Sequence, residues 1–567
     1  MYQELKQVRA KLTGPGGDFE VVTVDVRGNP TRTYKTGPQN LRELWLASMA
    51  FADREYLVYQ DERWTYAEAH AEVAAIASWL KAQGIQPGDR VGIAMRNYPE
   101  HLLCYWAIVS MGAVVVGMNA WWVGPELVYG IQDSAPKVIF CDQERLQRVL
   151  EHRKEVPEPL LVGVRLEGDF PAEVVSYEDK VKPHQGSLPD AKIDPDSDAC
   201  IFYTSGTTGK PKGAQQTHRG CVDNVMNILC SGAVNAHVQV MTGKLDPKEL
   251  ENPPQGVSLV TTPLFHVTAM NCVAQGGTAT GGKLVLMYKW DAGEALRLIE
   301  EERVSGMSGV PTMARELISH PDFPKRDTSS LLVLGGGGAQ LQPDLVGRIE
   351  KDVATARPNT GYGMTETCGI ITSIAGDFFV DRPASCGPVC PTFEVEIRDP
   401  EGKALPVGEV GELCVRGGPV IRGYLNRPDA TAETIENGWL RTGDLARLDE
   451  DGFVYIVDRL KDMVLRGGEN VYCAEVESAL FSHDDVAECV VFGVPDDRLG
   501  EEVGACVVPK PGVQLTAEAL RAHCAKQIAK HKIPRYIWLR NEALPRNANG
   551  KFLKRELREQ LAVGDAA

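Results

Sequence analysis

A regular alternation of helix and strand patterns between residues 65 and 140 limits this chain to a small group of folds. Thr65 and Glu68 form a capping-box pattern, and apolar residues at helical spacing follow until Gly84. Pro99 begins a second helical segment. Three apolar runs around these helices predict strands, at 91–95, 114–116 and 138–140. Because helices that connect parallel strands cover both faces of a sheet, the pattern predicts an α/β fold with open, largely parallel sheets.

The pattern changes twice beyond this region. Helix and strand patterns resume at about 258–334 and lead into four consecutive glycines at 335–338. From about residue 383, short strands with frequent turns favour a small β barrel or sandwich. Beyond Asp462, a new series of helices and strands predicts a separate α+β domain of about 100 residues. We therefore expect two doubly wound α/β subdomains and a small β-barrel-like subdomain at about 383–458, which together form an N-terminal region at 1–458, and a smaller α+β C-terminal domain at 463–567.

Two segments have unusual compositions. No charged residue occurs from Leu102 to Pro125, a length that would span a bilayer. An internal glycine and a β-branched run instead favour a buried helix followed by a strand. The segment 234–255 is polar and contains three prolines, so we expect an irregular surface insertion there.

Composition and charge exclude several classes of protein. The chain has 567 residues, of which 43% are hydrophobic and 24% are charged, so neither wholesale disorder nor a polytopic membrane protein fits. Lys and Arg total 60 against 77 Asp and Glu, and the net charge of −17 disfavours binding to nucleic acid or anionic lipid. Anionic substrates would need cations placed locally at their site.

The 14 cysteines are scattered along the chain. The closest pair, Cys386 and Cys390, has no second Cys or His pair nearby, so a metal centre is not favoured. No apolar leader follows Met1, and we therefore expect reduced, buried thiols in a cytoplasmic protein. The sequence leaves a homodimer open.

Residues 203–213 carry the strongest chemical signal. This loop follows a short apolar run and combines four Ser or Thr hydroxyls, three glycines and two lysines. Glycines let backbone N–H groups approach phosphate oxygens, hydroxyls donate hydrogen bonds, and Lys210 and Lys212 supply positive charge. Pro211 excludes the ordinary P-loop pattern, in which Ser or Thr follows the lysine. The loop predicts a polyphosphate site, and the alternative is an unspecialised surface loop.

This loop resembles the signature loop of the adenylate-forming superfamily, which contains acyl-CoA synthetases, luciferases and peptide-synthetase adenylation domains. Further segments match the family's motifs in the family's order, at 263–266, 362–367, 439–444, 458–462 and 545–551. The resemblance extends from about Leu41 to Leu557. It implies two-step chemistry, in which a carboxylic acid and ATP give an acyl-adenylate and the thiol of CoA then displaces AMP.

The second and third of these motifs suggest a nucleotide site. Tyr362 offers an aromatic face for a purine, Glu366 offers a carboxylate for Mg²⁺, and Asp444 offers acceptors for both ribose hydroxyls. Taken alone, the same residues would fit a core tyrosine, a surface glutamate and a turn-capping aspartate. The resemblance assigns Mg²⁺ to Thr204 and Glu366. It assigns ATP or AMP binding to a larger set: Thr204, Ser205, Gly206, Thr207, Thr208, Gly209, Lys210, Lys212, Gly338, Tyr362, Gly363, Thr365, Asp444 and Arg459.

The domain boundary and the C-terminus acquire roles through the resemblance. Without it, residues 459–462 would be an exposed charged linker and Lys551 the start of a solvated basic helix. By resemblance, 459–462 is a hinge in which the backbone of Lys461 rotates, so the C-terminal domain is mobile. Lys551 would bridge the substrate carboxylate and the α-phosphate. CoA contacts are assigned to Gly467, Gly468 and Glu469.

The first motif bears on the substrate. Phe265-His266 is typical of family members that activate acyl or aryl acids, whereas amino-acid-activating relatives place an aspartate nearby. The resemblance gives catalytic roles to Lys551, Glu366 and His266. It places the acyl pocket at His266, Val267, Met270, Val310, Gly335 and Gly336.

We expect an AMP-forming acyl-CoA synthetase that uses ATP, Mg²⁺ and CoA to activate a medium- or long-chain fatty acid. Three alternatives are an aryl or alicyclic acid, such as a steroid-derived side chain, an adenylating enzyme that loads a carrier protein, and a luciferase-like oxygenase. A catalytically silent binding protein should have lost Lys551 or Glu366, and both are present.

Overall fold

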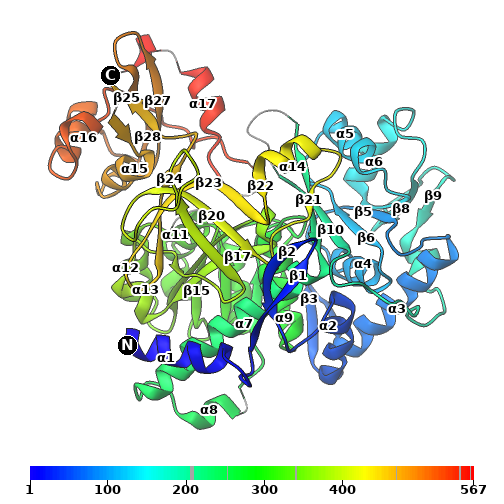
Figure 1. The fold of residues 1–567 in the computed structure, drawn as a ribbon. Coiled ribbons are helices and arrows are strands. Elements are labelled where there is room, and N and C mark those ends of the chain that lie inside the picture. The colour runs from blue at the N-terminus through cyan, green and yellow to red at the C-terminus, as the bar shows by residue number, and fades with distance from the viewer. Residues whose placement is uncertain are drawn as a thin grey trace.

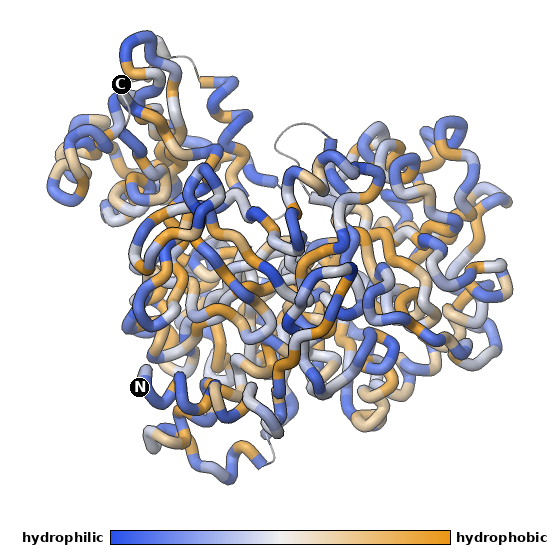
Figure 2. The backbone as a smooth tube through the Cα atoms, in the orientation of Figure 1, coloured by the Kyte–Doolittle hydropathy of each residue, from blue (hydrophilic) through white to orange (hydrophobic). Residues whose placement is uncertain are grey.

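The computed structural model describes residues 1–204, 210–251, 253–338, 341–467, 469–547, 551–561 and 563–566. Two α/β units form the body of the molecule, and the C-terminal segment lies above this body at the top left of Figure 1. Apolar residues concentrate on the strands inside the body, and polar residues on the outer helices and loops (Figure 2). The mixed α/β architecture with a distinct C-terminal domain confirms the predicted fold class.

The first α/β subdomain contains an eight-stranded sheet in the order β21-β11-β10-β6-β5-β7-β8-β9. Its six strands from β10 to β9 are parallel, and β11 and β21 are antiparallel at one edge. The strands are β5 (Arg90–Ala94), β6 (Val114–Gly117), β7 (Val138–Asp142), β8 (Leu160–Val164), β9 (Val174–Ser176), β10 (Asp198–Thr204), β11 (Lys212–Thr217) and β21 (Gly423–Tyr424). The intervening helices are α3 (Tyr66–Ala82), α4 (Pro99–Ser110), α5 (Gly124–Ser134) and α6 (Gln143–Glu151), with a helical turn η2 (Tyr177–Val181).

Local signals in this subdomain are confirmed. Thr65 Oγ1 accepts a hydrogen bond from Glu68 N at 3.2 Å, and Thr65 N donates to Glu68 Oε2 at 2.8 Å, so the capping box starts α3. The uncharged segment forms α4, in which every residue is buried, and the buried strand β6. Among the described residues, no helix is both long and apolar enough to cross a membrane.

The second α/β subdomain contains another eight-stranded sheet, in the order β17-β16-β15-β14-β12-β13-β3-β4. The six central strands are parallel, and β4 and β17 are antiparallel at the two edges. The strands are β3 (Glu55–Tyr59), β4 (Glu62–Thr65), β12 (Val257–Val260), β13 (Lys283–Leu286), β14 (Gly306–Gly309), β15 (Val333–Gly336), β16 (Arg357–Met364) and β17 (Gly369–Ala375). The helices and turns are α7 (His218–Met241), α8 (Pro247–Glu251), η3 (Thr268–Ala274), α9 (Gln275–Ala279), α10 (Ala292–Glu301), α11 (Pro311–Ser319), η4 (Phe323–Lys325), α12 (Pro343–Asp352), η5 (Thr365–Thr367) and α13 (Asp377–Asp381).

Two expectations for this subdomain were wrong. The segment 234–255 is not an irregular insertion, because α7 continues to Met241 and α8 follows. Val234 and Val238, one helical turn apart, are buried in the same core cluster as Val8 and Leu12 at the N-terminus. The strand patterns expected to end at about 334, before the four glycines, extend further, because β15 runs from Val333 to Gly336 and includes two of those glycines.

A six-stranded antiparallel sheet follows, in the order β18-β24-β23-β20-β19 with β22 paired to β23. Its elements are β18 (Gly387–Pro388), β19 (Phe393–Arg398), β20 (Gly411–Gly417), α14 (Pro428–Thr434), β22 (Ile435–Glu436), β23 (Trp439–Leu448) and β24 (Phe453–Arg459). The N-terminal segment contributes α1 (Tyr2–Thr13), the hairpin β1 (Val21–Val26) and β2 (Asn29–Tyr34), α2 (Leu41–Ala47) and η1 (Ser48–Phe51). Figure 1 shows this dark-blue hairpin lying across the front of the body.

The C-terminal segment has its own five-stranded sheet and core cluster. Strand β28 lies beside β25, β27 and β29. Its elements are β25 (Val464–Arg466), β26 (Glu469–Val471), α15 (Cys473–Phe481), β27 (Val486–Asp496), β28 (Gly500–Pro509), α16 (Ala517–Cys524), η6 (Lys530–Lys532), β29 (Tyr536–Leu539), α17 (Lys554–Gln560) and η7 (Val563–Asp565). All 14 cysteines are free thiols, and twelve of them are buried.

Candidate active site

The carboxyl ends of parallel strands from both sheets converge on one cavity, the position where open α/β sheets usually bind ligands. β10 ends at Thr204, next to the glycine-rich loop, and β12 leads to His266. β15 leads to Gly338, and β16 leads to Glu366. The cavity has a volume of about 2090 Å³ and is also lined by β23 and by the C-terminal segment.

Most of the predicted site residues within the described part of the chain line this cavity. They are Thr204, Lys212, His266, Val267, Val310, Gly336, Gly338, Tyr362, Gly363, Thr365, Glu366, Asp444, Arg459, Lys461 and Lys551. Six others lie outside the described residues: Ser205, Gly206, Thr207, Thr208, Gly209 and Gly468.

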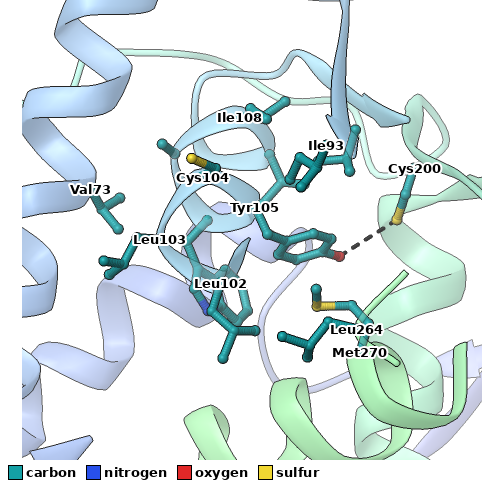
Figure 3. Close-up of a cluster of buried hydrophobic side chains, with 14 of the residues drawn as sticks. Val73, Ile93, Leu102, Leu103, Cys104, Tyr105, Ile108, Cys200, Leu264 and Met270 are labelled. Carbon is teal, nitrogen blue, oxygen red and sulfur yellow. Dashed lines mark hydrogen bonds between the residues drawn. The ribbon is translucent and has the colours of Figure 1, made fainter. Parts of the chain in front are cut away.

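Five predicted residues lie away from the cavity wall: Lys210, Met270, Gly335, Gly467 and Glu469. Met270 is fully buried in the core cluster that contains Leu264 and Tyr105, and Figure 3 shows these three side chains together. The structure therefore does not support Met270 as an acyl-pocket residue. Lys210 instead lies over the Tyr129 ring, with Nζ 4.8 Å from the ring centroid.

Asp444 joins three elements at one side of the cavity. Tyr362 on β16 donates its hydroxyl to Asp444 Oδ2 at 2.6 Å, and Arg459 Nε on β24 donates to Asp444 Oδ1 at 2.9 Å. Asp444 and Arg459 are paired neighbours on β23 and β24. Burial and the Asp444 charge raise the pKa of Tyr362 well above its usual value, so the phenol stays protonated and donates. The carboxylate keeps acceptor capacity for a ligand, because each oxygen can accept more than one hydrogen bond.

Glu366 lies on the short turn η5 and also lines the cavity. Tyr424 on β21 donates its hydroxyl to Glu366 Oε1 at 2.8 Å. Lys212 Nζ lies 4.5 Å from the Tyr424 ring centroid, which places the lysine within cation–π range. Burial and the Glu366 charge raise the pKa of Tyr424 above its usual value. Tyr424 therefore connects the predicted metal ligand to the predicted phosphate-binding lysine.

His266 presents a neutral imidazole to the cavity. Its Nδ1 accepts a hydrogen bond from Thr268 N at 3.2 Å and lies 3.1 Å from Thr268 Oγ1. Burial and the nearby Lys551 cation lower the pKa of His266 to about 3. Because Nδ1 is an acceptor, the proton resides on Nε2, and His266 can donate one hydrogen bond to an anionic oxygen.

Lys551 lies where the cavity meets the C-terminal segment. Enclosure by the cavity walls and the Arg459 cation lower its pKa, whereas the Asp444 and Glu366 carboxylates act in the opposite direction. Its backbone N donates to Asn547 Oδ1 at 3.0 Å. The side chain therefore lies near enough to Asp444, Glu366 and Arg459 for their charges to act on its pKa.

Contacts across residues 459–463 hold the C-terminal segment in this orientation. Asp458, at the end of β24, is buried and accepts a hydrogen bond from the backbone N of Cys473, which starts α15. Burial raises the pKa of Asp458 to about 6. The Arg315 guanidinium on α11 lies 5.6 Å from the Phe481 ring centroid on α15.

Several cavity residues have no signal in the sequence. Tyr424 belongs to a two-residue strand and to no recognised motif. Ile228 on α7, Cys272 on η3 and Ser308 on β14 also line the cavity. Their positions depend on how helices and strands pack, so sequence patterns alone could not identify them.

Comparison with known proteins identifies the family of this chain. Residues 45–425 match the family described as AMP-binding enzyme, and residues 475–551 match the AMP-binding enzyme C-terminal domain. A feruloyl-CoA synthase from Amycolatopsis sp is 35% identical over 499 residues, covering 88% of this chain and 94% of the relative. A long-chain-fatty-acid–CoA ligase from Bacillus subtilis is 31% identical over 535 residues, covering 90% and 92%. The crystal structure of an anthranilate CoA ligase in complex with anthranoyl-AMP superposes with a TM-score of 0.83 at 26% identity, covering 92% of this chain and 96% of that chain.

The family match spans well over half of the chain, and the relatives cover nearly all of it. The relatives named above act on different carboxylic acids and share the acid–CoA ligase reaction. The chain therefore belongs to the AMP-binding enzyme family, within the adenylate-forming superfamily, and is an AMP-forming acid–thiol ligase.

Proposed function

We propose that this protein activates a carboxylic acid with ATP and transfers the acyl group to CoA. In the first step, a substrate carboxylate oxygen bonds to the α-phosphorus of ATP, and pyrophosphate leaves with the electron pair of the broken P–O bond. In the second step, the CoA sulfur loses its proton and bonds to the acyl carbon, and AMP leaves. The observation that carries this proposal is the convergence of Lys551, His266, Glu366 and Asp444 on one cavity.

Each group suits a part of this chemistry. Asp444 would accept the ribose hydroxyls, and Tyr362 would pack against adenine. Lys551 would stabilise charge that develops between carboxylate and α-phosphate, and His266 Nε2–H would orient the acid. Glu366 and Thr204 offer the hard oxygen donors that Mg²⁺ prefers together with substrate phosphates, so both fit that ion. When bound, Mg²⁺ would neutralise phosphate charge.

We further propose that the domains move between the two steps. One cavity must first enclose ATP with Lys551 and later admit the long pantetheine arm of CoA. Residues 460–463 connect β24 to β25 and so join the two sheets, and the proposed hinge at 459–462 includes Lys461. The β25–β26 hairpin carries Gly467 and Glu469 outside the cavity in this orientation, so their proposed contact with CoA requires that movement.

For the acid itself, our first candidate remains a medium- or long-chain fatty acid. Ile228, Val267 and Val310 supply apolar wall near His266. A second candidate, an aromatic acid with polar ring substituents, is favoured by Thr268, Cys272 and Ser308, which add hydroxyl and thiol groups to the lining of the same cavity. These candidates differ in shape, so a substrate panel separates them.

The test is AMP release from ATP across straight-chain fatty acids, hydroxycinnamic and benzoic acids, and alicyclic acids, each with and without CoA. CoA-dependent AMP formation with at least one acid is expected. A carrier-loading enzyme would turn over only with holo-carrier, and a luciferase-like oxygenase would consume oxygen. If no acid elicits CoA-dependent AMP, the ligase proposal for CoA is incorrect.

A further inference from the structure

A cluster of buried amide side chains lies beneath the turn that carries Glu366. Its members are Gln216 on β11, Asn224 on α7, Asn271 on η3 and Gln275 on α9, and each is 0% exposed. Amides withdrawn from water need protein partners, and hydrogen bonds in such an environment fix geometry strongly. The partners of this cluster include the backbone of the Glu366 turn.

Gln216 and Asn271 bind the two ends of that turn. Gln216 Nε2 donates to the Thr365 carbonyl at 2.9 Å, and Asn271 Nδ2 donates to the Cys368 carbonyl at 2.9 Å. Asn271 Nδ2 also donates to Gln216 Oε1 at 2.9 Å, which couples the two amides. The two carbonyls flank Glu366 in the chain, so the two amides hold its backbone from both sides. We call Gln216 and Asn271 the clamp.

The backbone of this turn is strained enough to need such a clamp. Cys368 has φ of +51°, in the left-handed region that non-glycine residues rarely adopt, and Gly369 follows with φ of +142°. Conformations of this kind persist where the surroundings over-determine them. Asn224 extends the clamp, because its Oδ1 accepts from Ile370 N at 2.9 Å and its Nδ2 donates to the Asn271 carbonyl at 3.0 Å.

The carboxylate of Glu366 and the backbone of its turn are both held by residues that belong to β11 or pair with it. Tyr424, which donates to Glu366 Oε1, pairs with Ala214 of β11. Gln216 lies two residues further along β11, which begins at Lys212. β11 therefore positions Glu366 relative to the end of the phosphate-binding loop.

We propose that Gln216 and Asn271 are positioning residues for acyl-adenylate formation, because they hold the 365–368 turn and so place the Glu366 carboxylate. Neither side chain lines the cavity, so both act through Glu366. This inference rests on the proposed function, in which Glu366 serves the first half-reaction. It predicts that loss of the clamp impairs adenylation and leaves thioester formation intact.

The experiment compares Gln216→Met with Gln215→Met. Methionine keeps the volume of glutamine but removes the amide. Gln215 is the neighbouring residue on β11 and hydrogen-bonds Asp198 Oδ2 at 2.8 Å, away from the turn, so it is a matched control. Four quantities are measured: the rate of pyrophosphate release, its Mg²⁺ dependence, thioester formation from supplied acyl-adenylate, and hydrogen exchange of the 365–370 amides in the ligand-free protein.

For Gln216→Met we expect adenylation to fall at least about 20-fold, since small misplacements of reacting groups cost up to about 100-fold. The Mg²⁺ concentration for half-maximal rate should rise and the 365–370 amides should exchange faster, whereas thioester formation changes less than about twofold. In a Glu366→Gln background, Gln216→Met should add little further loss. Gln215→Met should resemble the wild type in every measurement.

Any one of three results would overturn the proposal. They are equal losses in both half-reactions, an unchanged adenylation rate, and a full additional loss when Gln216→Met is combined with Glu366→Gln. If Gln216→Met does not fold, Asn271→Leu breaks the same clamp and is judged by the same criteria. If the wild type forms no adenylate with any acid, the proposed function fails separately. Calorimetry then decides the positioning role: Gln216→Met should weaken binding of ATP with Mg²⁺ more than binding of ATP alone, and an equal effect refutes it.

Discussion

Replacing Lys551 with alanine is the most direct test of how this cavity works. Lys551 lies in the opposing fields of the Asp444 and Glu366 carboxylates and the Arg459 and Lys461 cations. Removing Lys551 takes one cation from a cavity in which Lys212 and Arg459 remain, so MgATP affinity should fall much less than the adenylation rate, by less than about threefold. In the transition state, negative charge grows beside this one lysine. Loss of a preorganised donor there costs about 2.7–4 kcal/mol, or about 100- to 1000-fold in rate.

The assay is single-turnover pyrophosphate release for adenylation, paired with thioester formation from supplied acyl-adenylate. In Lys551→Ala the rate of pyrophosphate release should fall about 100- to 1000-fold, whereas the rate of thioester formation should stay within about threefold of the wild type. Lys526→Ala, at an exposed lysine of the same C-terminal segment, is the matched control and should retain both. Equal loss of the two half-reactions, or a collapse of MgATP binding that accounts for the whole defect, would refute the reasoning.

Three further predictions follow from the hydrogen bonds and pKa shifts. Tyr362→Phe removes the 2.6 Å hydrogen bond to the Asp444 carboxylate. Because hydrogen bonds to charged groups contribute about 1.5–3 kcal/mol, calorimetry should show an ATP affinity that is weaker by about tenfold or more. An unchanged affinity would contradict the role of Asp444. Since the pKa of His266 is about 3, the activity ratio of wild type to His266→Gln should stay constant from about pH 5.5 to 8, and a step near 6.5 would show that the charged imidazole takes part. Burial lowers the pKa of His218 to about 4, so the unfolded chain binds a proton that the native protein excludes, and stability is lost as pH falls from about 6.5 to 4. At pH 5 this loss in the free energy of unfolding is about 2 kcal/mol. Denaturant titrations at pH 7 and pH 5 should show that His218→Asn abolishes this contribution. An unchanged pH dependence would exclude His218 as its source.

Secondary structure with a local cause was predictable from the sequence. The capping box at Thr65 starts α3, and the β-branched run predicted at 114–116 forms the buried strand β6. The end of α7 was not predictable in the same way. Residues 234–241 contain no charged residue and lead into a polar stretch with three prolines, and they remain helical because Val234 and Val238 are buried with residues of α1, more than 200 positions away.

The candidate site likewise contains residues that the sequence motifs identified and residues whose positions depend on packing. Motif residues at strand ends, such as His266 and Glu366, line the cavity as expected, because the carboxyl ends of parallel strands meet at one edge. The resemblance placed Met270, four residues after His266, in the acyl pocket. Successive residues of a helical turn face different sides, and Met270 faces the core with Tyr105, whereas Cys272 reaches the cavity.

By itself, the sequence determined the fold class and the order of the chemical motifs, because these depend on local periodicity and on residue types at short spacing. The type of reaction followed from the resemblance of those motifs to the adenylate-forming superfamily. Only the tertiary structure decided which side chains share the cavity and what supports them. Tyr424 reaches Glu366 from 58 positions away, and Gln216 reaches the Thr365 carbonyl from 149 positions away. The physical reason is that buried hydrogen bonds of this kind form only after strands distant in the chain have packed, so no local pattern encodes them.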